Sequence, residues 1–339
     1  MAAAEWGVRV VAARDEATRT TIMSMAPRIV TVTLNASIDQ TARIPNFTAG
    51  AVNRVAWEQA DAGGKGVNVA SFLADFGYAI AVTGILGADN QELFLRLFAE
   101  KELIDRFVRV PGHTRVNIKV VDDARHQVTD INFPGVAVRA AQIDEVFATI
   151  DALAAAGAEV FVLSGSLPAG VAPTVYRDIT ERLTTRGRRV VLDTSGEALA
   201  RAIEVAPNMI KPNIDELAEL LGHPLDDEPA IVAAARSLHK RGIEWVVVSM
   251  GGKGAIFVTA DAAVHAVPPR VPIKSTVGAG DAMVAGIVHA RLQNLGIEEC
   301  ARLATAFSLG ALGEIGPRLP ARDAIEAFAK RVKTRHIAA

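Results

Sequence analysis

The chain is poor in cysteine, in aromatic residues and in excess charge of either sign. Its one cysteine, Cys300, excludes an internal disulfide, and no Cys/His cluster has zinc-ligand spacing. These absences predict a reducing, cytoplasmic setting. The 36 basic and 38 acidic side chains give a formal charge of −2. This balance offers no electrostatic footprint for nucleic acid or for an anionic membrane surface.

Long hydrophobic runs and linker-like tracts are missing too. No charge-free apolar run reaches the length of about 18 residues that a membrane span needs. Half of the 339 residues are nevertheless hydrophobic and only 22% are charged, which predicts a sizeable buried core. The length allows two domains, or one large α/β domain with an insertion. Without a linker or a repeat, we expect one domain over residues 26–335.

The first residues of the chain match neither a signal peptide nor a core element. Arg9, Arg14 and Arg19 alternate with acidic residues, and there is no apolar h-region. We expect residues 1–25 to be a loose N-terminal tail, and a chain that starts at Met25 to fold and function like the full one.

Short apolar runs followed by helix-like stretches recur along the chain. Residues 28–34 alternate apolar and polar side chains as a half-buried strand does. Further strand candidates lie at 159–163, 189–192, 209–211 and 245–248. This order predicts an α/β fold with a doubly wound, mostly parallel sheet. Ligands bind at the carboxyl ends of such strands, where Ser164, Asp193, Asn213 and Ser249 fall.

Two segments, at about 40–60 and 113–133, break this rhythm. In the second, RVNIKVVD alternates strictly and HQVTDINF follows it after a turn near Asp122 and Asp123. Strands of this kind leave one face polar and need a partner surface. We interpret both segments as a small β-sheet lid on the α/β body.

Glycines precede an apolar helix at residues 275–286, STVGAGDAMVAG. Free N–H groups and the helix dipole at such a terminus favour an anion. Asp281 in that first turn is a candidate base that takes a proton from an attacking hydroxyl. The alternative is that Asp281 is only a favourable first-turn charge on a core helix.

A second glycine-rich stretch, AGGKGVNVA, covers residues 62–70. It fits neither the Walker A loop nor the dinucleotide fingerprint. Gly63 and Gly64 would expose N–H groups to sugar hydroxyls, with Asn68 one turn along as donor and acceptor. The alternative is a tight turn with Lys65 solvated and Asn68 facing water.

The run KPNIDEL places Asn213 and Glu216 at i and i+3 on one helix face. These two residues would hold a hydrated magnesium ion against nucleotide phosphates, because Mg²⁺ prefers oxygen ligands and keeps several waters. A capping box, which needs no ligand, explains the same spacing.

Together and in this order, the motifs resemble those of the sugar kinases of the ribokinase and PfkB family. SGSLPAGV (164–171), LDTSGEAL (192–199) and VVVSMGGKGAIF (246–257) are similar to the elements that connect the two glycine motifs in that family. The resemblance spans residues 28–330 and implies a ribokinase-like fold.

Within the family, the phosphosugar kinases are the most similar branch. TLNASID (33–39), the lysine of GGKG, and TRVNIKV with TDINFPG (129–135) look most like enzymes that act on fructose 1-phosphate. Minor 6-phosphofructokinases typically show GGGG and an arginine where Asp130 stands. They and tagatose-6-phosphate kinases remain the alternatives.

The resemblance implies an ATP-dependent transfer of a phosphoryl group to the 6-hydroxyl of fructose 1-phosphate, with Mg²⁺ as cofactor. It implies catalytic roles for Asp281, Gly280, Ala279 and Gly278. It implies substrate contacts for Asp39, Gly63, Gly64, Lys65, Asn68, Arg115, Arg54 and Ser164, the sugar phosphate meeting Arg115 and, with less support, Arg54 and Lys65. It implies ATP contacts for Lys211, Asn213, Glu216, Ser249, Gly251, Gly254 and Thr276.

The resemblance also implies a homodimer in which the β-sheet lids of two chains clasp each other. A hypothesis from another class is a non-catalytic sugar-phosphate sensor that keeps the fold without turnover. Asp281 argues against the sensor, because loss of the base is the simplest route to one, and here the base and both glycine motifs are intact.

Overall fold

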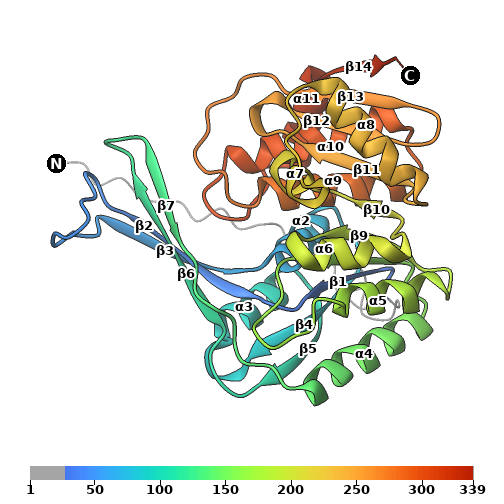
Figure 1. Cartoon of the computed structure of the whole chain (residues 1–339). Coiled ribbons are helices and arrows are strands. Elements are labelled where there is room, and N and C mark those ends of the chain that lie inside the picture. The colour runs from blue at the N-terminus through green and yellow to red at the C-terminus, as the bar shows by residue number, and fades with distance from the viewer. Residues whose placement is uncertain (1–26, 339) are drawn as a thin grey trace.

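The computed structural model describes residues 27–338 and contains two separate β-sheets (Figure 1). The tail predicted over residues 1–25 lies outside the described residues. The large sheet has ten strands in the order β14-β13-β12-β11-β10-β9-β8-β1-β4-β5. Its parallel strands are β1 (Ile29–Thr33), β4 (Ile80–Gly87), β5 (Ile104–Val110), β8 (Val160–Ser164), β9 (Arg189–Asp193), β10 (Met209–Ile210) and β11 (Trp245–Ser249).

Three antiparallel strands complete one end of this sheet: β12 (Ala255–Val258), β13 (Ala263–Val267) and β14 (Lys333–Ile337). The chain winds from β1 outward to β4 and β5, then returns to β8 on the other side of β1. The order of the strands therefore reverses at β1, where open α/β sheets bind their ligands.

Helices cover both faces of the large sheet. One face packs against α2 (Lys65–Asp75), α3 (Glu92–Glu100), α9 (Ala279–Leu292), α10 (Ile297–Leu312) and α11 (Arg322–Arg331). The other packs against α4 (Ala140–Ala155), α5 (Val175–Thr184), α6 (Gly196–Ala202), α7 (Ile214–Leu221) and α8 (Glu228–Lys240). Short 3-10 turns are η1 (Ala88–Asn90), η2 (Ile203–Val205) and η3 (Gly251–Lys253). The predicted doubly wound, mostly parallel fold is confirmed.

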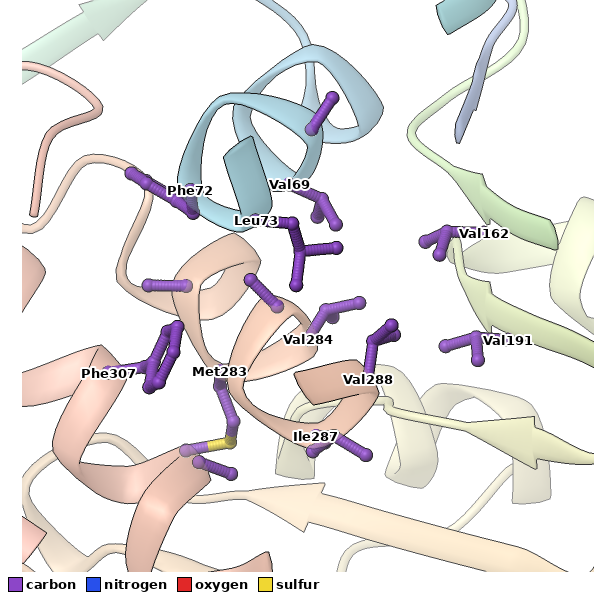
Figure 2. Close-up of a cluster of buried hydrophobic side chains, with 14 of the residues drawn as sticks. Val69, Phe72, Leu73, Val162, Val191, Met283, Val284, Ile287, Val288 and Phe307 are labelled. Atoms are coloured by element: carbon purple, nitrogen blue, oxygen red, sulfur yellow. The ribbon is translucent and has the colours of Figure 1, made fainter. Parts of the chain in front are cut away.

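The core between α2, α9 and α10 fixes the geometry of the site (Figure 2). Phe72 and Leu73 of α2 and Val284 of α9 lie in one buried cluster with Phe307 of α10. Nine of the fourteen residues of α9 are buried, because the helix is enclosed by the sheet and by these two helices. Each of the large apolar side chains in this cluster contributes about 1.5–3 kcal/mol by leaving water. The amino ends of α2 and α9 are thereby held together.

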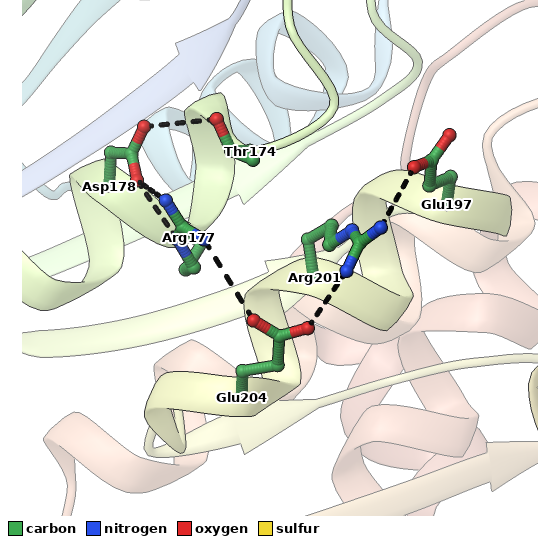
Figure 3. Close-up of polar contacts among 6 residues, drawn as sticks. All are labelled: Thr174, Arg177, Asp178, Glu197, Arg201 and Glu204. Carbon is green, nitrogen blue, oxygen red and sulfur yellow. Dashed lines mark hydrogen bonds and ion pairs between the residues drawn. The ribbon is translucent and has the colours of Figure 1, made fainter.

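An ion-pair network links the outer surfaces of α5, α6 and η2 (Figure 3). Its side chains are about a third to more than half exposed, so screening by water leaves each pair only a small contribution to stability. Its members are Thr174, Arg177, Asp178, Glu197, Arg201 and Glu204. The network takes no part in the site described below.

The small sheet projects from the body (Figure 1). Its strands are β2 (Ser37–Arg43), β3 (Trp57–Gly63), β6 (Arg115–Asp122) and β7 (Gln127–Ile131), in the order β3-β2-β6-β7. β2 and β6 run parallel, while β3 and β7 are antiparallel to their neighbours. Ala42, Ile44 and Val120 form a small apolar core of its own. The predicted small sheet is present.

No helix within residues 27–338 is long and apolar enough to cross a bilayer.

Candidate functional site

The first turn of α9 is the centre of the candidate site. Gly278 caps this helix with φ at 74°, a backbone conformation that favours glycine. Asp281 in that turn is only 7% exposed, whereas Gly280 is open to solvent. The Ala279 N–H donates to the Thr276 carbonyl at 3.4 Å. The N–H groups of Gly280 and Asp281 have no acceptor inside the helix, so they remain for a ligand.

Asn68 of α2 holds the Asp281 carboxylate. Its Nδ2 donates to Asp281 Oδ2 at 2.7 Å, across 213 residues of sequence. Burial raises the pKa of Asp281 from 3.8 to about 6, with Asp193 adding to the rise and the positive charge of Lys65 opposing it. A carboxylate with this pKa is charged at neutral pH and accepts a proton readily.

Two lysines converge on one buried aspartate beside Asp281. Lys65 Nζ lies 3.2 Å from Asp193 Oδ1, and Lys211 Nζ lies 3.3 Å from the same oxygen. Burial alone would raise the pKa of Asp193, but the two ammonium groups outweigh it and lower that pKa. Burial likewise opposes the charge on Lys65, but the nearby carboxylates, Asp193 foremost, raise its pKa. Lys65 therefore remains protonated at neutral pH.

Polar side chains on the small sheet form the opposite wall. Asp39 Oδ1 accepts from the Ser37 hydroxyl at 2.8 Å and from Asn117 Nδ2 at 3.1 Å. A side chain at Gly63 would begin 2.5 Å from Asp39 Oδ2, so only glycine allows this approach. Arg115 donates to the carbonyls of Asn35 and Ala36. Burial lowers the pKa of Arg115, while Asp39 opposes the shift.

Of the predicted substrate contacts, Arg54 is not brought to this centre, and Ser164 lies beside Asp193 with its side chain buried. Arg54 is exposed in the hairpin loop that joins β2 to β3, beyond the pair Arg43 and Trp57. Strand residues advance about 3.3 Å each, so that end of the sheet lies on the order of 20 Å from Gly63. Ser164 ends β8 nearby, but it is fully buried and its hydroxyl has no partner among the described residues.

The predicted nucleotide contacts lie along the carboxyl ends of β10 and β11. Lys211 follows β10, and the backbone of Asn213 forms an isolated parallel β-bridge with that of Ser249 at the end of β11. Gly251 begins η3, Gly254 follows it, and Thr276 is exposed just before α9. Gly64, the remaining predicted sugar contact, caps α2 beside Lys65.

Asn213 and Glu216 form a complete capping box at the start of α7. The Glu216 N–H donates to Asn213 Oδ1 and the Asn213 N–H to Glu216 Oε2, each at 2.8 Å. The capping interpretation of their spacing is therefore present in the structure. It uses one oxygen of Glu216, and the other remains for solvent or for a hydrated cation.

Sequence reasoning placed Asp193 at the ligand-binding edge of the sheet without giving it a role, and it missed Asn117 as a member of the site. Asp193 falls at the carboxyl end of a buried strand, which is a signal for ligand contact, but no pattern predicts that it pairs with two lysines. Asn117 lies two residues after Arg115 on β6, so both side chains project from the same face of the sheet. That alternation was the available signal.

The arrangement suits the transfer of an anionic group to a hydroxyl. A buried carboxylate with a raised pKa lies at a helix amino terminus, with two fixed ammonium groups beside it. The carboxylate can accept the hydroxyl proton, and the N–H groups and cations can neutralise a phosphoryl group in transfer. Within residues 27–338 no cluster of three or more His, Cys, Asp or Glu side chains forms a direct metal site.

Known proteins with similar sequences and structures are sugar kinases. The 1-phosphofructokinase of Rhodobacter capsulatus is 53% identical over 308 residues, or 91% of this chain and 98% of the relative. That of Xanthomonas campestris pv. campestris is 46% identical over 290 residues, or 84% and 91%. A solved structure of a possible 1-phosphofructokinase from Thermotoga maritima superposes with a TM-score of 0.84 at 27% identity, covering 91% of this chain and 99% of that one.

The profile of the pfkB family carbohydrate kinases matches residues 29–324, which include both glycine motifs and both walls of the site. Because this profile matches most of the chain, and the chain is 53% identical to a relative that it covers almost end to end, this chain belongs to the pfkB family of carbohydrate kinases.

Proposed function

We propose that this chain is an ATP-dependent kinase that phosphorylates the 6-hydroxyl of fructose 1-phosphate to give fructose 1,6-bisphosphate. The observation that carries the proposal is the pairing of Asp281, buried and hydrogen-bonded to Asn68, with the free amino end of α9. The names of the relatives from Rhodobacter capsulatus and Xanthomonas campestris support the choice of sugar.

The two walls of the site give the sugar an orientation. Arg115 and Asp39 lie on the small sheet, and Asp281 lies on α9 of the α/β body. A phosphate on carbon 1 held near Arg115 leaves the 6-hydroxyl to face Asp281. The ring hydroxyls would donate hydrogen bonds to the Asp39 carboxylate and accept one from the Asn68 amide. The Asp281 carboxylate then takes the proton of the 6-hydroxyl while the 6-oxygen of the sugar attacks the γ-phosphorus.

ATP is the co-substrate, placed along Lys211, Ser249, Gly251, Gly254 and Thr276. The proposal includes Mg²⁺, held through water by the Glu216 carboxylate and the Asn213 amide. The donor set fits a hydrated magnesium ion, because both groups offer oxygen and Glu216 keeps one carboxylate oxygen outside the capping box. Bound there, the ion would neutralise charge on the nucleotide phosphates.

A comparison of acceptor sugars tests the proposal. Turnover of fructose 1-phosphate, fructose 6-phosphate and tagatose 6-phosphate is measured with ATP and the purified chain. We expect kcat/KM to favour fructose 1-phosphate by about 100-fold or more, because a nucleophile misplaced by about 1 Å costs that much. Equal or better turnover of either 6-phosphate would overturn the named sugar.

The proposal also includes a homodimer formed through the small sheet, in the cytoplasm. Large apolar side chains are exposed on this sheet and its loops, and Val52 is 90% exposed. The set is Val52, Val55, Trp57, Val128, Ile131 and Phe133. Exposed apolar clusters of this kind mark protein interfaces. If Arg54 meets a sugar phosphate, it does so in the partner chain, because it lies far from Asp281 of its own.

A further inference from the structure

The carboxylate of Asp193 orders two cations at the heart of the site. Asp193 is 1% exposed, and its Oδ1 lies within 3.3 Å of the Nζ atoms of both Lys65 and Lys211. Its Oδ2 has no partner among the described residues. A charge buried this deeply is tolerated only when it is paired, so the two ammonium groups are held where Asp193 places them.

Lys65 is held beside Asp193 and close enough to Asp281 for each charge to act on the other. Lys65 is the first residue of α2, and its side chain is 36% exposed, so a ligand can reach it although its ammonium group pairs with Asp193. The carboxylates that raise its pKa belong to Asp193, Asp281 and Glu216, all of them on elements around the large sheet. Lys211 Nζ lies 3.7 Å from the point where a side chain at Gly280 would begin. Both cations therefore flank the amino end of α9.

We infer that Lys65 contacts the phosphoryl group in transfer rather than the phosphate of the sugar, and that Asp193 is the positioning residue that holds it there with Lys211. This assignment rests on the proposed function and differs from the sugar-phosphate contact that the family resemblance implies. Arg115 on the small sheet remains the cation for the sugar phosphate.

The reaction balances without a further reactant. The 6-oxygen of the sugar forms a bond to the γ-phosphorus while the bond from that phosphorus to the β,γ-bridging oxygen breaks. The bridging oxygen leaves with the electron pair as part of ADP, and the hydroxyl proton passes to Asp281. Lys65 keeps its proton throughout and neutralises charge on the equatorial oxygens of the transferred group.

An acceptor without a phosphate distinguishes a contact of Lys65 with the transferred phosphoryl group from a contact with the sugar phosphate. Lys65→Met and Arg115→Ala are assayed with saturating ATP on fructose 1-phosphate and on fructose. If Lys65 contacts the transferred group, Lys65→Met loses about 100-fold in kcat/KM on both acceptors. Arg115→Ala loses activity on fructose 1-phosphate alone, because fructose has no phosphate to hold. Lys101→Met removes a lysine that pairs with Asp75 at the far end of α2, and it should leave both rates near those of the wild type.

A Lys65→Met loss that disappears on fructose would overturn the inference and return Lys65 to the sugar phosphate, with the proposed function intact. A wild-type chain inert towards all three phosphosugars would instead overturn the proposed function, and the inference with it.

The positioning role of Asp193 has its own readout. Asp193→Asn should lower kcat while KM for fructose 1-phosphate stays within about twofold, and it should add little to Lys65→Met in the double variant, because both changes remove one arrangement. Losses that simply multiply would assign Asp193 a separate structural role. The fructose comparison does not depend on the folding of this variant.

Discussion

At the scale of single residues, Asp281 combines a catalytic candidate with a local instability. Burial raises its pKa from 3.8 in the unfolded chain to about 6 in the folded one. The folded state therefore holds the proton more tightly, and the stability this contributes is lost as pH rises from about 4 through 6. At pH 7 the buried charge costs up to about 3 kcal/mol.

Asp281→Asn should therefore separate activity from stability. We expect kcat to fall by about 100-fold or more, because a general base contributes on that scale. We expect Tm at pH 7 to rise, because the amide removes the buried charge and keeps the shape. Steady-state assays and thermal unfolding on one preparation check both, with Asp61→Asn as a control outside the first turn of α9. A folded variant with near wild-type kcat would reject Asp281 as the base.

Asn68 lowers the pKa of Asp281, the proposed base. Its hydrogen bond stabilises the charged carboxylate and so lowers the pKa of Asp281 against the effect of burial. Asn68→Ala should move the acid limb of the kcat/KM profile upward from about pH 6, because that limb reports the free enzyme. A residue that only contacted the sugar would raise KM at every pH and leave the limb in place, and that result would contradict the prediction.

At the scale of elements, substitution can separate the helix cap at the start of α7 from the Mg²⁺ contact proposed for the same two residues. Glu216→Gln keeps the capping box, since glutamine serves as well at that position, but it removes the charge that would attract hydrated Mg²⁺. We expect the unfolding free energy to change by less than about 0.5 kcal/mol while the Mg²⁺ concentration for half-maximal rate rises several-fold. Asn213→Ala is the matched loss of the cap and should cost about 1 kcal/mol. An unchanged Mg²⁺ requirement in Glu216→Gln would leave this pair as a cap only.

The strands were predictable where alternating or continuous apolar residues mark them in the sequence. Alternation over residues 28–34 and the apolar run at 159–163 correspond to β1 and β8, and the strictly alternating RVNIKVVD is β6. The antiparallel strands β12 to β14 were not predicted, because nothing in their short apolar runs indicates antiparallel rather than parallel pairing. Side-chain partners were out of reach as well. Lys65 meets Asp193 across 128 residues, a distance closed only by the winding order of the sheet.

At the scale of the whole molecule, the small sheet and its loops carry six of the ten large apolar side chains that are exposed within residues 27–338. β7 is exposed along its whole length, and β3 and the loop before it present apolar side chains to solvent. An edge strand with apolar neighbours invites pairing unless another surface covers it. A second copy of the same sheet would cover it by a two-fold operation, and the proposed dimer would use Arg54, which lies far from its own Asp281, in the site of the partner chain.

This geometry predicts that two inactive variants restore each other. Arg54→Ala removes a cation that the partner site would use, and Asp281→Asn removes the base from its own site. In a mixed dimer, one site combines an intact Asp281 with an intact Arg54, so mixing the two variants should recover about a quarter of the wild-type rate at statistical exchange. Each variant alone should stay near its own low rate, and a Val128→Lys background, which places a charge in the proposed interface, should abolish the recovery and yield monomers by sedimentation. Mixed samples that remain as inactive as their components, although exchange is shown by labelled chains, would confine Arg54 to a role within its own chain or to none.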